Sequence, residues 1–565
     1  MDISINHYPL FMDTVYGHMQ SQPMHTACVF QSRGIETAVH LSYQALNVKV
    51  SERTQLLLTL GYQGKSVALI YPSGLDFIVN FLACLSAGVI AVPLNVTRNA
   101  QQFERTINIF EDAKIQTILT TKDTQKNLIQ QLSDIPTLSQ PSFVWIDELQ
   151  TTLSTSALPK IQPDHIAFIQ YTSGSTSSPK GVMVSHENIV DNMKAIQNGC
   201  GHKQGLIAGG WLPQFHDMGL IGHMLHPIYM GGTYVFMPPM NFIQRPRRWL
   251  ELISHYKIFC SASPNFGYEH CVKLISDKED LSHIDLSCWK VALNGSEPVN
   301  ADTMADFSKK FAQCGFNPQS FFPSYGMAEA TLFISGGPKS SGVDVITLDK
   351  KLFAQGKIKQ SKIGLEIVNC GAISPRFQIK IVDPVSLHEC SCDQTGEIWI
   401  SGKSVAQGYI NNPEKTASDF NARIIPSDDY RYLRTGDMGF IHQGMLFVTG
   451  RIKELLIIRG RNHYPYDIER TCNNYEHSAG GSGAAVFTFE HNQQTKLAAI
   501  VEIKKVSLRD LEKNQLKSDI HELVSKHHEI TFDKLMLVRP GVIPKTTSGK
   551  IKRSACNALL YDIKK

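Results

Sequence analysis

The strongest constraint on the fold is a strand–helix–strand pattern between residues 66 and 94. The apolar run SVALIY predicts a short buried strand, and the residues from Pro72 to Gly74 predict a turn. The next segment, LDFIVNFLACLSA, has the length and spacing of a helix, Gly88 is suited to end it, and VIAVPL predicts a second strand. A βαβ unit of this kind indicates a parallel sheet that is covered by helices.

Further strand-like runs follow at TYVFM, KVALNG and FQIKIVDP, with helical patterns between them. From EIWISG to FVTGR, short strands separated by glycines indicate an antiparallel subdomain, and after Arg451 the pattern becomes that of a small α+β unit. We therefore predict an α/β fold with two domains. Residues 1–451 would form a large domain, with parallel α/β subdomains and a small antiparallel β subdomain, and residues 452–565 would form a smaller, mobile α+β domain.

The composition sets limits on function. A chain of 565 residues is too long for one hydrophobic core, and 42% hydrophobic with 19% charged residues is typical of a soluble globular protein. The net charge of +4 is too small to indicate a nucleic-acid binder, and the most apolar stretch, residues 77–94, is interrupted by Asn80, Gly88 and Pro93, which argues against stable membrane insertion. Twelve scattered cysteines and the absence of a signal peptide predict a cytoplasmic location.

The segment 171–181, YTSGSTSSPKG, resembles a phosphate-binding loop but not a Walker P-loop. The Walker motif requires a glycine before its lysine and a helix after it, whereas here Pro179 precedes Lys180 and GVMV continues as a strand. A helix is predicted only after Ser185, which suits an N-cap. Glycine and hydroxyl groups with one lysine are suited to hold phosphate oxygens. A mobile surface turn accounts for the same residues, so the loop alone leaves both interpretations open.

Six segments in a fixed order decide between them. They are YTSGSTSSPKG, LNGSEPV (293–299), PSYGMAEAT (323–331), YLRTGDMGF (432–440), GRIKELLIIRGRN (450–462) and PKTTSGKIKR (544–553). Together they resemble the acyl-adenylate-forming (ANL) superfamily, which includes acyl-CoA synthetases, peptide-synthetase adenylation domains and luciferases. The resemblance spans nearly the whole chain.

Within that superfamily, WLPQFHDMGLIG (211–222), SYGMAEAT and RGRNHYPYDIE (459–469) resemble the fatty acyl-AMP ligases. These enzymes make acyl-adenylates and pass the acyl group to a carrier-protein phosphopantetheine thiol rather than to coenzyme A. Residues 342–371 resemble the insertion of that subfamily, with its core at about 342–365. Two positions depart from the superfamily pattern: Ser177 replaces a usual glycine, and Ala328 replaces a usual threonine whose hydroxyl touches the nucleotide phosphate.

The resemblance implies ATP and Mg²⁺ as cofactors. Lys550 would bridge the carboxylate of the acid and the α-phosphate, Glu329 would hold Mg²⁺, and His216 would line the carboxylate end of an acyl channel. The nucleotide would be bound by a larger set, comprising Thr172, Ser173, Gly174, Ser175, Thr176 and Lys180 at the phosphates, Gly295, Ser296, Glu297, Tyr325, Gly326 and Met327 at the adenine side, Asp437 at the ribose, and Arg451 at the ribose or the phosphate.

Each of these residues also has a purely structural explanation, such as a solvated basic tail for Lys550, a helix-start acid for Glu329 and a turn for Asp437. Asp217 is expected to anchor the following helix rather than to react. Because Lys550 lies in the small domain, the resemblance implies that this domain closes over the site, with Lys453 as its hinge.

Three other segments have weaker claims to a function. HECSC (388–392) has poor spacing for a structural zinc site, so a surface hairpin is predicted, and RPRRW (245–249) is predicted to be a solvated helix face. The apolar run 226–243 either lines the acyl channel or forms ordinary core.

We therefore predict an enzyme that activates a medium- to long-chain fatty acid to acyl-adenylate with release of pyrophosphate. The acyl group would then go to an acyl carrier protein that acts in trans, because no carrier domain follows Lys550 before residue 565. One alternative is a long-chain fatty acyl-CoA ligase, against which the insertion and the NHYP segment count. The other is a nucleotide- or acyl-binding module without turnover, against which intact Lys550, Asp437 and Glu329 count.

Overall fold

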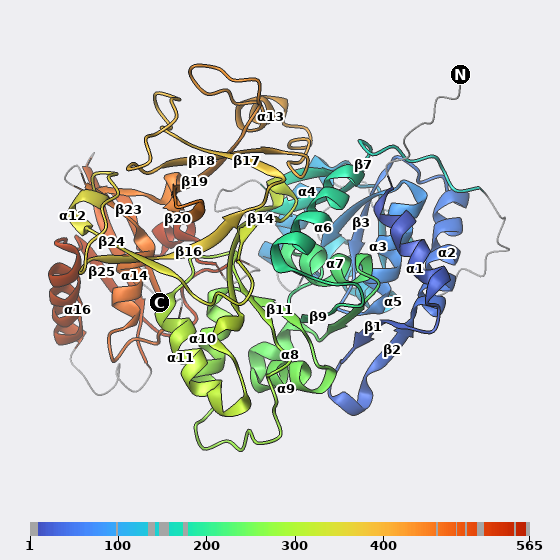
Figure 1. The fold of residues 1–565 in the computed structure, drawn as a ribbon, viewed down its shortest axis with the longest axis horizontal. Coiled ribbons are helices and arrows are strands. Elements are labelled where there is room, and N and C mark those ends of the chain that lie inside the picture. Colours follow the sequence, from blue (N-terminus) through green and yellow to red (C-terminus); the bar gives the residue numbers. More distant parts are fainter. Residues whose placement is uncertain are drawn as a thin grey trace.

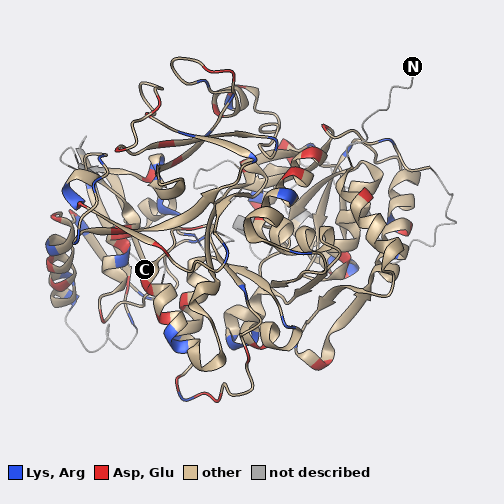
Figure 2. Ribbon diagram, viewed as in Figure 1, with Lys and Arg blue, Asp and Glu red and all other residues tan. Residues whose placement is uncertain are grey.

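The structure is a computed structural model, and it describes residues 9–97, 100–133, 142–145, 157–172, 179–458, 461–481, 483–491, 494–504, 513–546 and 550–560. Figure 1 shows the chain passing from an N-terminal α/β region through a long, curved sheet into a C-terminal α+β region. Lys, Arg, Asp and Glu are interspersed along this ribbon, as the small net charge leads one to expect (Figure 2).

The first α/β layer has the strand order β6-β5-β3-β4-β7-β8. Its strands are β3 (Ser66–Ile70), β4 (Ile90–Leu94), β5 (Thr117–Thr120), β6 (Ser142–Trp145), β7 (Ile166–Thr172) and β8 (Lys180–Ser185). Neighbouring strands are parallel except for β8, which is antiparallel to β7. Helix α3 (Leu75–Ala87) joins β3 to β4 and ends at Gly88 in the left-handed conformation, with φ of 64°. The predicted βαβ unit is therefore confirmed.

The longest sheet begins as a second parallel layer, in the order β13-β12-β11-β9-β10-β1, with β2 antiparallel at its edge. These strands are β1 (Thr26–Phe30), β2 (Val39–Ser42), β9 (Ile207–Gly210), β10 (Thr233–Phe236), β11 (Cys260–Ser263), β12 (Val291–Asn294) and β13 (Phe321–Gly326). Because β11, β12 and β13 are parallel, their carboxyl ends lie at one edge of the sheet, where ligands of α/β proteins commonly bind.

After β13 the same sheet becomes antiparallel, in the order β14-β16-β20-β19-β18-β17. The strands are β14 (Phe333–Gly336), β15 (Val345–Leu348), which pairs with β16 (Leu365–Ile373), then β17 (Phe377–Val382), β18 (Gly396–Gly402), β19 (Leu433–His442) and β20 (Met445–Arg451). The predicted antiparallel region is confirmed, and the insertion contributes β15 and the short helix α12 (Lys350–Phe353).

The C-terminal region contains a three-stranded sheet, β23-β24-β25, and a two-stranded sheet, β21-β22, within the described residues. Its elements are β21 (Leu456–Ile458), β22 (Arg461–His463), α14 (Pro465–Asn473), β23 (Ala484–His491), β24 (Gln494–Glu502), α16 (Lys513–His528), β25 (Lys534–Val538) and α17 (Arg553–Leu559). This arrangement confirms the predicted α+β unit, in which α14 begins at Pro465.

The remaining helices cover the faces of the sheets, as Figure 1 shows for α1, α2, α3 and α6. They are α1 (Phe11–Ser21), α2 (Tyr43–Thr59), α4 (Ala100–Asp112), α5 (Lys122–Ser133), α6 (His186–Cys200), α7 (His226–Tyr229), α8 (Pro239–Gln244), α9 (Arg247–Tyr256), α10 (Asn265–Leu274), α11 (Ala301–Phe311) and α13 (Pro413–Phe420), together with the shorter or tighter turns η1 (Ile35–Thr37), η3 (Ala312–Cys314), η4 (Pro318–Ser320), η5 (Ala328–Ala330) and η6 (Ile452–Glu454), and the π-helix η2 (Met218–Leu225). Helix α6 begins at Ser185, whose hydroxyl accepts a hydrogen bond from the Asn188 amide, so the predicted N-cap is confirmed.

Separate hydrophobic clusters hold these regions together. The largest joins α3 and β4 to α6 and η2, and a second surrounds Trp249 and Trp289 beneath β11 and β12. The C-terminal sheet has clusters of its own around Ile468 and Phe487. Within the described residues no helix is both long and apolar enough to cross a membrane.

Candidate active site

A cavity of about 2110 Å³ lies where the carboxyl ends of β11, β12 and β13 meet the β19–β20 hairpin and the C-terminal region. Its walls contain residues from both halves of the predicted two-domain arrangement, including Tyr325 and Asp437 on one side and Tyr466 and Lys550 on the other. Those predicted site residues that the structure describes thus line one cavity.

Asp437 is held in this wall by two hydrogen bonds. The antiparallel pairing of β19 with β20 sets Asp437 opposite Arg451. The Arg451 Nε donates to Asp437 Oδ1 at 2.9 Å, and the Tyr325 hydroxyl donates to Oδ2 at 2.8 Å. Because Asp437 is buried and both of its oxygens are engaged, its carboxylate is fixed in position before any ligand arrives.

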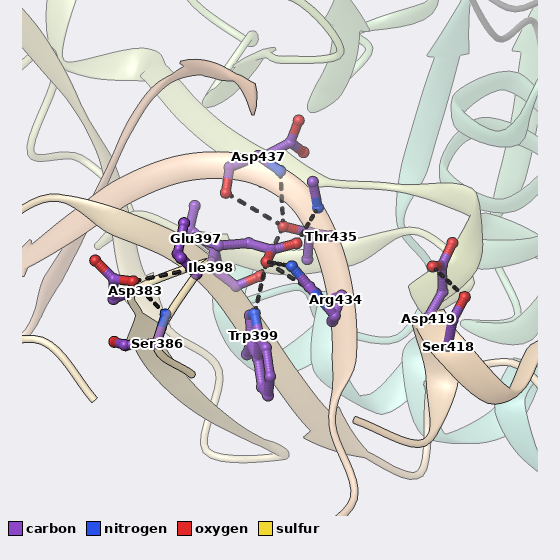
Figure 3. A network of polar contacts seen from close by, with 12 residues as sticks. Asp383, Ser386, Glu397, Ile398, Trp399, Ser418, Asp419, Arg434, Thr435 and Asp437 are labelled. Carbon is purple, nitrogen blue, oxygen red and sulfur yellow. Dashed lines mark hydrogen bonds and ion pairs between the residues drawn. The ribbon is translucent and has the colours of Figure 1, made fainter. Parts of the chain in front are cut away.

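A second buried carboxylate, Glu397, supports the turn that carries Asp437 (Figure 3). Its Oε2 accepts from Arg434 at 2.7 and 3.0 Å and from Trp399 Nε1 at 2.9 Å, while Oε1 accepts from the Gly436 amide at 3.0 Å. The sequence interpretation missed this residue. The only available signal was an acidic residue inside the otherwise apolar strand EIWISG.

Glu329 lies at the short turn η5. Just before this turn, the backbone at Gly326 passes very close to the backbone at Leu332. A Cβ on Gly326 would lie 2.0 Å from the Leu332 carbonyl oxygen, so only glycine fits there. The Glu329 Oε1 accepts a hydrogen bond from the Tyr409 hydroxyl at 3.0 Å, and burial raises the pKa of the carboxyl against the lowering effect of this bond. Tyr409 is a second residue that the sequence interpretation missed.

Lys180 faces the same tyrosine from the other side, with its Nζ 4.8 Å from the Tyr409 ring centroid. It lies opposite Thr172 in the β7–β8 hairpin, and both residues line the cavity. The hairpin pairing confirms that the segment after Lys180 is a strand. The other predicted members of the phosphate loop, Ser173, Gly174, Ser175 and Thr176, and the variant position Ser177 lie outside the described residues.

The segment Gly295–Glu297 follows β12 at the edge where the parallel strands end. A Cβ on Gly295 would lie 2.9 Å from the Ser324 Oγ, and Ser296 has a positive φ of 71°. The Glu297 Oε1 accepts a hydrogen bond from the Phe266 amide at 2.6 Å, while burial raises the pKa of this carboxyl to about 7. With Tyr325, Gly326 and Met327, these residues line the cavity as a group.

His216 and Asp217 stand at the entrance to η2. The His216 Nδ1 lies 2.6 Å from Asp217 Oδ1, and the same oxygen accepts from the Met218 amide at 2.7 Å. Asp217 therefore caps the helix, as predicted, and His216 lines the cavity beside it.

Lys550 also lines the cavity, although it belongs to the C-terminal region. Burial and the nearby Arg451 guanidinium lower the pKa of its ammonium group, whereas Asp217, Glu297 and Asp437 raise it. Lys550 therefore lies near carboxylates from three separate segments of the chain, those of Asp217, Glu297 and Asp437. The structure thus places Lys550 in a closed arrangement, with its charge inside the cavity.

The cavity continues into an apolar part between α6, η2, β11 and β14. Most of its lining residues there are small or hydrophobic, namely Ile196, Cys200, Gly222, Cys260, Ala262, Leu293, Leu332 and Phe333, and His202 and His223 line it as well. The run 226–243 contributes none of the lining residues in the described chain; it forms α7, β10 and α8 and is mainly core. Of the two interpretations of this run, the structure therefore supports ordinary core and not the channel lining.

The weaker sequence candidates behave as ordinary surface. HECSC lies in the connection between the antiparallel strands β17 and β18, and no cluster of His, Cys, Asp or Glu suited to a metal exists in the described part of the chain. In RPRRW, Arg247 pairs with Glu251 at 2.7 Å and with Glu279 at 3.0 Å on the outer face of α9.

Comparison with known proteins agrees with this site. Residues 16–410 match the family model described as AMP-binding enzyme, and residues 453–561 match the one described as Disco-interacting protein 2-like, AMP domain. The medium-chain-fatty-acid–[acyl-carrier-protein] ligase JamA of Moorena producens is 35% identical over 97% of this chain and 94% of its own.

Solved structures give the same result. A fatty acyl-adenylate ligase from L. pneumophila, crystallised with acyl adenylate and pyrophosphate, is 35% identical, with a TM-score of 0.77 over 100% of this chain and 98% of its own. A structure from a study of fatty acyl-adenylate ligases of E. coli and L. pneumophila is 30% identical, with a TM-score of 0.88 over 98% of both chains. The chain therefore belongs to the AMP-binding enzymes and, within them, to the fatty acyl-AMP ligases.

Proposed function

We propose that the protein joins a medium- to long-chain fatty acid to AMP and then passes the acyl group to the phosphopantetheine thiol of an acyl carrier protein. A carboxylate oxygen of the acid attacks the α-phosphorus of ATP, the bond to the bridging oxygen of the β-phosphate breaks, and pyrophosphate leaves. The observation that carries the proposal is the convergence of Lys550, Asp437 and Glu329 on one cavity that continues into an apolar channel.

Asp437 and Arg451 form the nucleotide side of the mechanism. The Asp437 carboxylate, oriented by Arg451 and Tyr325, would accept hydrogen bonds from the two ribose hydroxyls, and this places the α-phosphate toward Lys550. Gly295, Ser296 and Glu297 would form the wall against the adenine, since the backbone there passes close to Ser324. Fixing the nucleotide in this way lowers the entropic cost of bringing the two anions into line.

Lys550 supplies the positive charge at the reacting centre. It would contact both the fatty-acid carboxylate and the α-phosphate, whose negative charges repel each other as they approach. Lysine suits this position because its compact charge sits on a long, flexible stem. His216 would line the carboxylate end of the channel, near the point where the acid and nucleotide meet.

Glu329 fits a role in binding Mg²⁺, because it offers a carboxylate within the cavity wall and the ion takes its other ligands from phosphate and water. When bound, the ion would neutralise charge on the leaving pyrophosphate. Lys180 and Thr172, at the base of the phosphate loop, would hold the β- and γ-phosphates together with Ser173, Gly174, Ser175 and Thr176.

We further propose that residues 1–451 and 452–565 act as two bodies, with a hinge at Lys453. This residue lies in the short turn η6, which connects β20 to β21. Rotation there would withdraw Lys550 after adenylation and admit the carrier thiol. The cysteines are all unpaired, which supports a reducing, cytoplasmic setting.

A product assay tests the proposal directly. Purified protein is incubated with ATP, Mg²⁺ and decanoate, together with either a carrier protein that bears its phosphopantetheine arm or coenzyme A, and the products are identified by mass spectrometry. We expect pyrophosphate release in both mixtures but acyl transfer only to the carrier protein. Acyl-CoA formation at the rate of adenylation would replace the proposal with an acyl-CoA ligase, and no decanoate-dependent pyrophosphate release would leave only a binding module.

A further inference from the structure

A histidine lies at the far end of the apolar channel, at the carboxyl end of α6. Gly201 ends this helix in the left-handed conformation, with φ of 60°, and the His202 amide then donates to the Gln197 carbonyl at 3.0 Å. This cap turns the His202 side chain inward. His202 is 6% exposed and lines the cavity beside Cys200 and Cys260.

His202 is one half of a buried pair. Its Nδ1 lies 2.9 Å from the Nε2 of His226, the first residue of α7, which packs beside α6 (Figure 1). The other ring nitrogen of His202, Nε2, has no hydrogen-bond partner among the described residues. Burial lowers the pKa of His202 to about 3, so both rings are neutral at physiological pH. The free nitrogen is a donor in one tautomer of the pair and an acceptor in the other.

A second histidine lies nearer the adenylating end. The His223 Nε2 accepts a hydrogen bond from the Ala262 amide at 2.8 Å, so in the neutral ring Nδ1 carries the proton. This N–H is buried and finds no partner in the described part of the chain, and His223 also lines the cavity. The channel wall therefore carries two polar points on an apolar surface.

Strand β11 gives the depth of each point. Ser263 pairs with Asn294, at the edge of the sheet where the parallel strands end and Gly295–Glu297 follow. Ala262, which contacts His223, is the residue before Ser263. The His202 ring packs against Phe259, with centroids 6.1 Å apart. Since a strand rises by about 3.3 Å per residue, Phe259 lies about 13 Å from the level of Ser263. His202 is thus placed to meet the end of an acyl chain, not its carboxyl group.

The chemistry of this end selects the ligand. A plain alkyl terminus would leave the His202 nitrogen buried without a partner, which is costly. A terminal ammonium would meet the field of Lys339, the same charge that helps to lower the pKa of His202. A terminal carboxylate would be attracted by that charge, but it would exchange its hydration for at most one hydrogen bond from the neutral His202 ring. A hydroxyl group donates and accepts one hydrogen bond each, so it pairs with either tautomer.

We propose that His202 forms a polar subsite at the far end of the acyl channel and binds a hydroxyl group at or near the ω carbon of the fatty acid. The proposal rests on the proposed function, because it assigns the substrate class of that same channel. His226 is a positioning residue, since it holds the His202 ring without lining the cavity.

The test compares plain and ω-hydroxy acids from hexanoate to tetradecanoate by acid-dependent ATP–pyrophosphate exchange. We expect wild-type kcat/KM to favour the ω-hydroxy acid by about tenfold or more at the one chain length that reaches His202, because a site built for a hydroxyl discriminates against analogues that lack it. At lengths that reach neither His202 nor His223 the preference should disappear. His202→Leu should abolish or reverse the preference, and His202→Gln, which keeps a donor and an acceptor, should retain much of it.

His223→Leu is the matched comparison, because it removes a buried polar group nearer the adenylating end and should leave the preference at the longer length in place. Equal kcat/KM for plain and hydroxy acids at every length in the wild type would overturn the subsite while leaving the proposed function intact. A preference that survives in His202→Leu would overturn it as well. Because the wild-type series alone decides the first outcome, poor folding of a variant does not rescue the proposal. Failure of exchange with every acid would instead overturn the proposed function itself.

Discussion

The nucleotide wall around Asp437 and the acyl wall around His202 differ in whether their buried polar groups have hydrogen-bond partners. At the nucleotide wall, both oxygens of Asp437 accept hydrogen bonds from protein groups, and both oxygens of Glu397 behind it do the same. At the acyl wall, His202 and His223 each keep a ring nitrogen without a partner among the described residues. Each unmet group of that kind costs roughly 1–3 kcal/mol.

The difference separates preorganisation from recognition. A wall whose hydrogen bonds are complete holds its side chains in place and requires no rearrangement when the nucleotide binds. A wall with unmet groups is completed only by a ligand of matching chemistry, and it rejects those that lack it. Changes at the first wall should therefore lower the rate or the stability, whereas changes at the second should alter which acid is chosen.

Lys550 is the strongest test of the ordered wall. Lys550→Ala should lower acid-dependent pyrophosphate exchange by about 10²–10³, because one preorganised charge is lost at the reacting centre. ATP binding, measured by calorimetry, should change little, since Asp437 and Arg451 lie within residues 1–451, the proposed large domain. Lys526→Ala, at an exposed lysine of α16, is the control and should keep wild-type exchange. Near wild-type exchange in Lys550→Ala would contradict the role given to Lys550.

Glu397→Gln removes the carboxylate that supports the turn of the nucleotide wall before Asp437. Its new amide places a donor against either the Arg434 and Trp399 donors or the Gly436 amide, so the turn before Asp437 loses its support. Removing one partner of a buried ion pair typically costs about 3–5 kcal/mol. We expect a clear fall in Tm and a rise of about tenfold in KM for ATP, with acid preference unchanged.

The control for that variant is Glu389→Gln, which removes an exposed ion pair with Lys380 at 2.7 Å. Pairs at the surface contribute about 0–1 kcal/mol, so neither Tm nor KM should change appreciably. If Glu397→Gln behaves like this control, the network in Figure 3 does not hold the Asp437 turn.

Much of the fold was predictable because its signals are local. Apolar runs, a helical spacing and a glycine at the helix end predict the βαβ unit at 66–94. Glycines likewise indicate the ends of β18 and β20. The gathering of Asp437, Glu329 and Lys550 followed from segment resemblance, not from any local pattern.

What the sequence did not reveal depends on contacts between distant segments. Tyr409 meets Glu329 across 80 positions of sequence, and Glu397 supports a turn on the neighbouring strand. The run 226–243 looked like a channel lining because it is apolar, yet core and channel walls share that composition. Only the structure shows that no residue of this run lines the cavity.

Phe353 lies where the insertion contacts the C-terminal region, a third part of the molecule to compare with the two walls. Its ring lies 5.8 Å from the Tyr464 ring, and Lys350 donates to the His527 carbonyl nearby. If these contacts restrict rotation about Lys453, Phe353→Ala should allow slow acyl-CoA formation, which we expect the wild type to lack. Deleting residues 342–365 should allow more, with adenylation retained. Ile363→Ala, at a residue 89% exposed in the same segment, is the control. No acyl-CoA from either Phe353→Ala or the deletion would contradict this role.

Glu297 is the exception within the ordered wall, and its effect should be the smallest. Burial raises the pKa of its carboxyl to about 7 from an ordinary value of 4.5, even though the Phe266 amide and Lys550 act to lower it. Because the folded-state pKa is raised, the stability that the protonated form contributes is present at low pH and is lost as pH rises through about 7. Glu297→Gln keeps the acceptor for Phe266 without the charge, so its Tm relative to wild type should rise by a few degrees between pH 5 and pH 8 and then level off. Glu52→Gln, at an exposed carboxylate of α2, should give a Tm difference that does not vary over this range. A difference for Glu297→Gln that is equally flat would mean that Glu297 is already ionised in the folded protein at pH 5, and that the nucleotide wall contains no exception to its order.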